Sequence, residues 1–221
     1  MSLVMNRPIR GLLLDLDDTL FDERSTARRA FAAWQPAHGG HYPDEDVEQA
    51  FHRWRLITDK HWKRHSAGEI TFLDQRRERL REFVGQALTN AEADALFEPY
   101  MQAYQSSWSL VDDAVEFLQR CAHLPKVIVT NGPRVMQERK LSSLGLTDHF
   151  VGMVTPDDCG HAKPRPEIFH RALGLIGLPA AECLMVGDDH VCDIEPAHAL
   201  GMAAFHIQPG VNELLGALAL L

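Results

Sequence analysis

The feature that most constrains this chain is a short apolar run that ends abruptly in acidic residues. Leu12–Leu14 is typical of a strand buried on both faces in the middle of a parallel sheet. Ligands of open α/β sheets bind beyond the carboxyl ends of the strands, so Asp15, Asp17 and Thr19 are expected at that edge. Side-chain alternation points Asp15 and Asp17 the same way, and a divalent cation such as Mg²⁺ would relieve the repulsion between their carboxylates. Taken alone, these acids also fit a turn that ends a strand.

Composition excludes several classes of protein. The chain of 221 residues is long enough for one α/β core and a small second module. A formal net charge of -9 disfavours general binding to nucleic acids or acidic membranes. Neither a membrane-spanning stretch nor a secretory signal is recognisable, so the cytoplasm is the expected location. The four cysteines lack Cys-x-x-Cys spacing, which favours reduced thiols over a zinc site or disulfides.

Helical periodicity follows the first strand and persists over residues 23–109. A first helix is expected over 23–34, stopping near Pro36, and a second is opened by Pro43 and Asp44. Thr71 and Thr89, each with an acid three residues later, are typical helix starts. Four helices without an intervening strand predict a helical bundle inserted after the first strand. The second helix is expected to bury a stripe formed by Val47, Phe51, Trp54, Thr58, His61 and Trp62.

Strands and helices alternate from residue 110 to the end. Strands are expected over 126–129, 150–154, 183–187 and 203–207, with helices between them and a last helix over 212–220. This order predicts right-handed crossovers and a parallel sheet, and hence an α/β, Rossmann-like core made of residues 6–22 and 110–221. The carboxyl ends of three strands then converge at Asp15, Thr130 and Asp188.

The polar segments at these ends form a set of motifs in a fixed order. They are Asp15-Leu16-Asp17-Asp18-Thr19, Thr130-Asn131-Gly132, Lys163 before Pro164, and Gly187-Asp188-Asp189 with Asp193. This set resembles the four ordered motifs of the haloacid dehalogenase superfamily, and the resemblance covers nearly the whole chain. It implies a Rossmann-like core with a helical cap, residues 23–109, inserted after the first motif.

The resemblance also implies the chemistry. Asp15 would be the nucleophile that forms an aspartyl-phosphate, and Asp17 would protonate the leaving oxygen and later deprotonate the hydrolytic water. Mg²⁺ would lie between Asp15 and Asp188, with the Asp17 backbone carbonyl, the phosphate and waters as further ligands. Asp189 adjoins Asp188, so two assignments of the outer ligand are open; we favour Asp188, with Asp189 behind it.

Donors for the phosphoryl group are expected from the other motifs, because phosphoryl transfer spreads negative charge over its equatorial oxygens. The hydroxyl of Thr130, the backbone N–H of Asn131 and the ammonium of Lys163 would supply them. Thr19 and Gly132 belong to the same predicted phosphate-binding set. Asp193 would hold Lys163 or metal-bound waters from behind.

Asp17 distinguishes branches of the superfamily. Haloacid dehalogenases lack an acid at this position and use no Mg²⁺, whereas phosphatases and sugar-phosphate mutases keep it. Phosphonate-cleaving relatives use a cap lysine; Lys60 and Lys63 exist here, but Asp17 argues against that reaction. The expected activity is hydrolysis of a small phosphorylated metabolite, with a mutase or a non-catalytic phosphate-ester-binding protein as alternatives.

The cap also resembles those of nucleotide phosphatases and acylneuraminate-phosphate phosphatases. The resemblance lies in residues 61–71 and in Arg76, Arg77 and Arg79, and it favours a nucleoside 5'-monophosphate as substrate. Trp62 would suit stacking on a base, although Trp and His on a helical stripe more often serve packing. His61 and His65 have helical spacing but lack a third ligand for a metal. A monomer or homodimer is expected.

Overall fold

The structure is a computed structural model, and it describes residues 8–38, 46–208 and 214–221. The chain divides into two compact units, one of Met1–Glu23 with Ser109–Leu221 and one of Arg24–Trp108. The first unit contains the sheet, and the second contains helices α1 to α4. Pro43 and Asp44, which the sequence pattern places at a helix start, lie outside the described residues.

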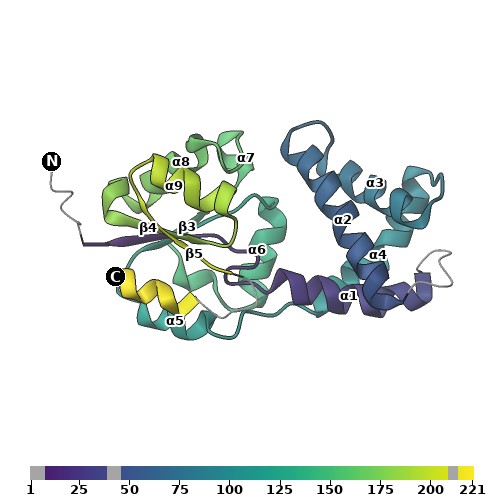
Figure 1. Cartoon of the computed structure of the whole chain (residues 1–221), viewed down its shortest axis with the longest axis horizontal. Coiled ribbons are helices and arrows are strands. Elements are labelled where there is room, and N and C mark those ends of the chain that lie inside the picture. Colours follow the sequence, from purple (N-terminus) through teal and green to yellow (C-terminus); the bar gives the residue numbers. More distant parts are fainter. Residues whose placement is uncertain (1–7, 39–45, 209–213) are drawn as a thin grey trace. The chain divides into compact units, whose positions relative to one another are not determined.

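The first unit is built on a five-stranded parallel sheet, which confirms the predicted Rossmann-like α/β core (Figure 1). Strand order is β3-β2-β1-β4-β5, so β1 lies at the centre between β2 and β4. All four residues of β1 are buried, as expected of a central parallel strand. The strands are β1 (Gly11–Leu14), β2 (Lys126–Val129), β3 (Gly152–Val154), β4 (Cys183–Gly187) and β5 (Ala203–His206).

Helices cover both faces of this sheet. In Figure 1, α8 (Pro166–Ile176) and α9 (Glu195–Ala199) lie over one face, and α5 (Ala114–Arg120) lies over the other with the C-terminal 3₁₀ segment η4 (Leu214–Leu220). Leu13 of β1 and Val127 of β2 belong to the same hydrophobic cluster as Phe169 of α8. Because apolar side chains fill both faces, polar side chains are left to the strand ends. The crossover from β2 to β3 contains α6 (Arg134–Ser143) and the 3₁₀ turn η1 (Thr147–His149).

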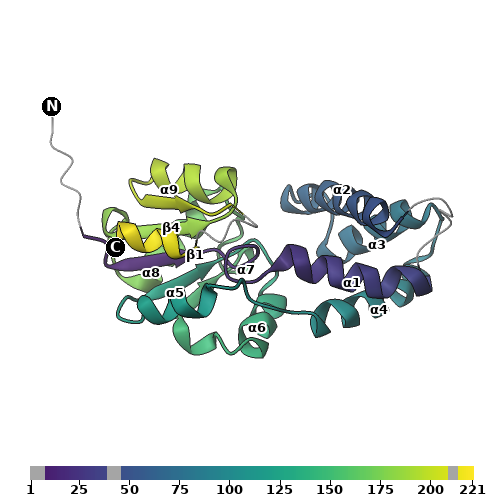
Figure 2. The same ribbon diagram turned by 60° about the horizontal axis from the view of Figure 1, so that its bottom comes forward.

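Among its described residues, the second unit consists of helices α1 to α4 (Figure 2), and aromatic side chains form its core. They are α1 (Glu23–His38), α2 (Val47–Ser66), α3 (Phe72–Val84) and α4 (Asn90–Ser106). The predicted starts at Thr71 and Thr89 are confirmed: both side chains accept N-cap hydrogen bonds, and Thr89 forms a full capping box with Glu92. The core includes Phe31, Trp34, Trp54, Phe83 and Tyr100.

The structure refines several local expectations. Helix α1 ends at His38, two residues past Pro36, and a short helix, α7 (Pro156–Cys159), precedes Lys163. On α2 the buried residues are Ala50, Trp54, Ile57 and His61, whereas Val47 is 39% exposed. Both stripes have helical spacing and share Trp54 and His61, but the buried face runs through Ala50 and Ile57 rather than through Val47. Two short elements, η2 (Ala180–Glu182) and the π-helical turn η3 (His190–Ile194), flank β4.

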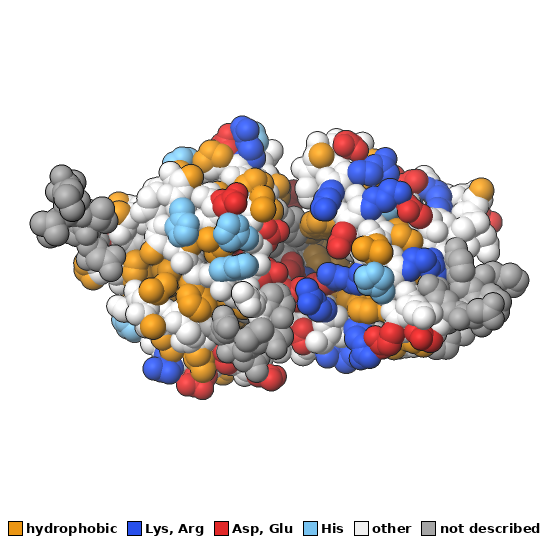
Figure 3. Space-filling view, viewed as in Figure 1, with side chains coloured by type: hydrophobic (Ala, Val, Ile, Leu, Met, Phe, Trp, Pro, Cys, Tyr) orange, Lys and Arg blue, Asp and Glu red, His pale blue; other side chains and the backbone are white. Residues whose placement is uncertain are grey.

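The surface of the helical unit is strongly charged. The face of this unit seen in Figure 3 bears many Lys and Arg side chains with acidic side chains among them. Several are paired, as Lys60 is with Glu82 and Arg77 with Asp94.

Within the described ranges, no helix has both the length and the apolar character needed to cross a membrane.

Candidate active site

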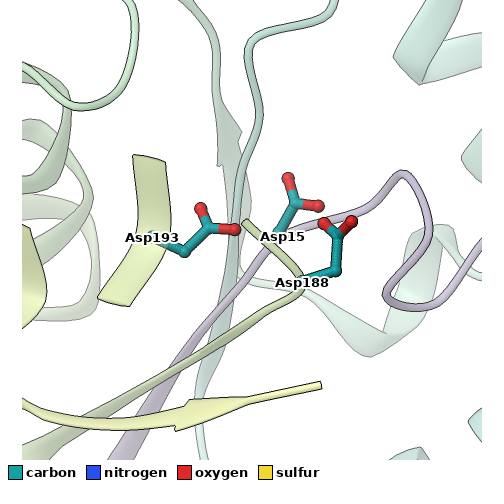
Figure 4. Close-up of side chains that lie close together, drawn as sticks. All are labelled: Asp15, Asp188 and Asp193. Carbon is teal, nitrogen blue, oxygen red and sulfur yellow. The ribbon is translucent and has the colours of Figure 1, made fainter. Parts of the chain in front are cut away.

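Three carboxylates meet at the carboxyl edge of the sheet. Asp15 follows β1, Asp188 follows β4, and Asp193 lies on η3 (Figure 4). One carboxylate oxygen from each lies within 4.8 Å of the others. The Asp15 N–H donates to the Val186 carbonyl at 2.9 Å, and the Asp188 carbonyl is hydrogen-bonded by His206 Nε2 at 2.8 Å. Backbone pairing with β4 therefore fixes where Asp15 lies, and the side chain of His206 on β5 holds the backbone at Asp188.

Lys163 joins two of these acids. Its Nζ donates to Asp15 Oδ1 at 2.7 Å and to Asp193 Oδ1 at 2.6 Å, and its side chain is almost fully buried. The Asn131 side chain holds the Lys163 backbone in place, since Asn131 Oδ1 accepts from the Lys163 N–H at 2.7 Å and Nδ2 donates to its carbonyl at 3.0 Å. The loop that contains Lys163 is thus tied to the turn after β2.

The charges in this cluster do not balance. Desolvation by burial raises the pKa of Asp15 to about 7, despite the opposing attraction of Lys163. Desolvation and the charges of Asp15 and Asp18 raise the pKa of Asp188 to about 8. For Lys163, desolvation alone would lower the pKa, but Asp15 and Asp193 raise it above its ordinary value. When all three carboxylates are ionised, one ammonium leaves two negative charges, so the oxygen donors and this charge both fit a divalent cation.

Asp189 does not join the acidic cluster. Its side chain accepts from the N–H groups of Val191 and Cys192, both at 2.9 Å, and thereby caps η3. Its backbone N–H donates to Asp193 Oδ2 at 3.2 Å. Of the two adjacent acids, the structure brings Asp188 to Asp15. Gly187 is required beside them, because a Cβ atom there would lie 2.2 Å from Asp193 Oδ2.

The turn after β2 supplies hydrogen-bond donors. The Thr130 hydroxyl is buried and accepts from the Gly132 N–H at 3.1 Å and from Gln137 Nε2 at 2.8 Å. Two accepted bonds leave the hydroxyl proton for another acceptor. In the described part of the chain, the Asn131 N–H has no hydrogen-bond partner. Gly132 was predicted to belong to the phosphate-binding set, but its N–H already donates to the Thr130 hydroxyl.

The chain turns sharply at Asp18, three residues after Asp15. Asp18 adopts the left-handed conformation with φ 57°, which Asp tolerates better than most residues, and its N–H donates to the Phe21 carbonyl. Thr19, expected to bind phosphate, is fully buried, and its hydroxyl donates to Asp15 Oδ2 at 3.3 Å. Asp17 stays partly exposed, with 33% of its side-chain surface accessible.

Two residues that bind Asp17 were missed in the sequence. Gln137 Nε2 donates to Asp17 Oδ2 at 2.7 Å, and the Lys140 ammonium forms an ion pair with Asp17 Oδ1. Both side chains are buried. A signal was available: Gln137 and Lys140 occupy the same helical stripe as Leu141, where an apolar side chain is the usual choice.

The singled-out residues of the helical unit mostly have local partners. His61 is buried, with Nε2 2.7 Å from Glu82 Oε2 and Nδ1 3.2 Å from Arg64 Nη1, which leaves neither ring nitrogen for a metal. Trp62 contacts the rings of His65 and Phe72. The guanidinium of Arg76 lies over Phe72 and that of Arg79 over Trp54.

Comparison with known proteins agrees with this geometry. Residues 9–201 match the family model of haloacid dehalogenase-like hydrolases. The chain is 29% identical over 248 residues to haloacid dehalogenase-like hydrolase domain-containing protein 3 of Mus musculus, covering 96% of this chain and 95% of that protein. It is also 29% identical over 196 residues to the pyrimidine 5'-nucleotidase YjjG of Escherichia coli, covering 87% of this chain and 83% of that protein.

The fold has a close counterpart among solved structures. The HAD-hydrolase YfnB of Bacillus subtilis, crystallised with magnesium, superposes with a TM-score of 0.75 and 22% sequence identity, over 93% of this chain and 90% of that one. At this identity the similarity concerns the fold. Together with the match over residues 9–201, the four motifs and the acidic cluster around Lys163, it shows that this chain belongs to the haloacid dehalogenase-like hydrolases.

Proposed function

We propose that the protein is a Mg²⁺-dependent phosphomonoesterase that acts on a small phosphorylated metabolite through an aspartyl-phosphate. The observation that carries this proposal is the cluster of Asp15, Asp188, Asp193 and Lys163, with two uncompensated negative charges at the carboxyl edge of the sheet. Asp17 adds the acid that a phosphate ester needs for its leaving group. The nucleotidase of Escherichia coli among the relatives supports the same class of reaction.

Mg²⁺ would be held by Asp15 and Asp188, with the Asp17 backbone carbonyl as a third protein ligand. When bound, it would neutralise negative charge on the phosphoryl oxygens. Asp193 is the less suitable ligand of the cluster, because Oδ1 accepts from Lys163 and Oδ2 accepts from the Asp189 N–H. We assign it instead to holding Lys163 in place.

In the first step, an Asp15 carboxylate oxygen attacks phosphorus, and the bond from phosphorus to the ester oxygen breaks. Asp17 gives its proton to that leaving oxygen. Lys163, the Thr130 hydroxyl and the Asn131 N–H donate to the phosphoryl oxygens. In the second step, Asp17 takes a proton from water, the resulting hydroxide oxygen bonds to phosphorus, and the bond to Asp15 breaks. Inorganic phosphate and the free Asp15 carboxylate result.

We propose a nucleoside 5'-monophosphate as the favoured substrate. The likeness to the pyrimidine 5'-nucleotidase of Escherichia coli supports it. We further propose that residues 23–109 act as a specificity cap that contacts the substrate beyond its phosphate and excludes water.

A direct assay tests the reaction class. With Mg²⁺, the purified protein should hydrolyse p-nitrophenyl phosphate, and EDTA should stop the reaction. A panel of phosphorylated metabolites ranked by kcat/KM then tests the substrate, and phosphorus NMR on sugar phosphates would reveal a mutase through isomerised product. Binding of phosphate esters without turnover across the whole panel would refute the phosphatase proposal.

A further inference from the structure

Helix α6 presents two buried polar side chains to the same carboxylate. Gln137 is 1% exposed and Lys140 is 4% exposed, yet each contacts Asp17. Gln137 Nε2 lies 2.7 Å from Asp17 Oδ2, and the Lys140 ammonium is paired with Asp17 Oδ1. Both carboxylate oxygens are therefore held by one helix, which starts directly after the turn that contains Thr130.

Burial of Lys140 is unusual and calls for a reason. A lysine is almost never fully buried unless it is paired, and a buried ion pair contributes little net stability. Here the ammonium is buried, 4.3 Å from the centre of the Phe21 ring, while the Asp17 side chain stays one-third accessible. The cation is thus placed behind the acid, and the acid keeps an open side. Such an arrangement suits an acid that must meet a substrate.

Gln137 links the acid to the phosphate-binding turn. Its Nε2 donates both to Asp17 Oδ2 and to Thr130 Oγ1, at 2.7 and 2.8 Å. In the carboxylate form that Asp17 adopts once it has given up its proton, both oxygens accept, and the amide nitrogen faces Asp17 accordingly. Thr130 then accepts from Gln137 and from the Gly132 N–H, and its own proton is left to donate elsewhere. Gly132 makes room for this contact, since a Cβ there would lie 2.3 Å from Gln137 Nε2.

We propose that Gln137 and Lys140 are positioning residues of the reaction. They fix Asp17 as the proton donor and acceptor, and Gln137 also turns the Thr130 hydroxyl proton toward the phosphoryl group. When Asp17 gives its proton to the leaving oxygen, a carboxylate is left beside the Lys140 ammonium, which stabilises that charge. When Asp17 later takes a proton from water, the same pair holds it in place. This inference rests on the proposed phosphatase function.

Leaving-group dependence separates this role from a merely structural one. A 2,4-dinitrophenyl leaving group departs without protonation, whereas the alkoxide of a nucleoside monophosphate needs a proton. Because kcat/KM reports steps up to departure of the leaving group, Lys140→Met should lower it about 10²-fold for the nucleotide and less than about 5-fold for the dinitrophenyl ester. Gln137→Met should lower kcat/KM on both substrates, because Gln137 also contacts Thr130, but the loss should be larger on the nucleotide. Equal losses on the two substrates would overturn the inference.

A double-mutant cycle tests whether Lys140 acts through Asp17. Adding Lys140→Met to an Asp17→Asn variant should cause no further loss of kcat/KM on the nucleotide, because the group that it positions is already removed. A further loss of the full single-mutant size would contradict the proposal. Arg139→Met is the matched control: this exposed cation is adjacent on α6, and its loss should leave both substrates unaffected.

Loss of folding and failure of the proposed function must each be distinguished from failure of the inference. Thermal melting identifies a variant that fails to fold, and Lys140→Arg, which keeps the charge, then replaces Lys140→Met and should retain more nucleotide activity than Lys140→Gln. If Arg and Gln lose equally, the inference is wrong. A wild-type protein that hydrolyses neither ester would overturn the proposed function and the inference with it, whereas normal wild-type turnover with equal variant losses would overturn only the inference.

Discussion

Two buried lysines lie at the same sheet edge, but their surroundings differ. Lys163 is paired with Asp15 and Asp193 and has Asp188 close by, so negative charge is in excess. Lys140 is paired with Asp17, and the neutral amide of Gln137 completes the contacts to that carboxylate. In the first region carboxylates outnumber cations, which is the setting proposed for Mg²⁺, whereas in the second region one carboxylate is paired with one ammonium. Around Lys163 the excess negative charge favours a bound cation, whereas around Asp17 the charges are paired and the contacts only hold the carboxylate in position.

The largest effect is expected for the nucleophile. Asp15→Asn removes the attacking carboxylate while keeping its size, so kcat on p-nitrophenyl phosphate should fall by at least about 10⁴-fold in the presence of Mg²⁺. Asp148→Asn, an exposed acid on η1, is the control and should keep wild-type activity. Comparable rates for Asp15→Asn and wild type would remove Asp15 from the mechanism.

The two lysines should differ in their contribution to stability. Lys163→Met leaves Asp15 and Asp193, with 8% and 1% exposed side chains, without their cation. The free energy of unfolding in urea at about pH 8 should fall by about 3 kcal/mol. Lys140→Met leaves only the partly exposed Asp17, so its cost should stay near 1 kcal/mol or less. Similar losses of unfolding free energy in the two variants would contradict the difference in charge balance between the two regions.

Magnesium should stabilise the protein more at high pH. The pKa values of Asp15 and Asp188, about 7 and about 8, lie above the ordinary aspartate value of 3.8, so the folded state keeps protons that the unfolded state releases. In EDTA, stability should therefore fall as pH rises from about 4 to about 8. Saturating Mg²⁺ should raise the melting temperature by several degrees at about pH 8.5 and by less at about pH 6. A pH-independent shift would argue against a cation at these acids.

The smallest effect is expected from Asp17 on metal binding. Asp17→Asn removes a carboxylate that Lys140 and Gln137 already engage, and it keeps the backbone carbonyl. The Mg²⁺-induced rise in melting temperature should therefore match that of wild type, although kcat/KM on the nucleotide falls. Asp188→Asn should abolish that rise. A reduced shift for Asp17→Asn would mean that its carboxylate belongs to the metal region.

The strand ends were predictable because their signal is local. Leu12–Leu14 and 183–187 are apolar runs that stop at acids, and parallel pairing brings such ends together wherever the strands are neighbours. The helix N-cap residues Thr71 and Thr89 were predictable for the same reason, since an N-cap motif spans only a few residues. The buried stripe of α2 could not be predicted in full, because burial depends on which helices pack against it.

The sequence by itself determined the fold class, the order of the four motifs and the residues that meet at the sheet edge, because strand pattern and motif spacing are properties of the chain. Tertiary structure decided the partners. It placed Asp188 rather than Asp189 beside Asp15, used Asp189 to cap η3, and brought Gln137 and Lys140 to Asp17 across more than a hundred residues of sequence. The local pattern shows only that Gln137 and Lys140 lie on an otherwise apolar helical stripe; their partner is set when distant segments pack.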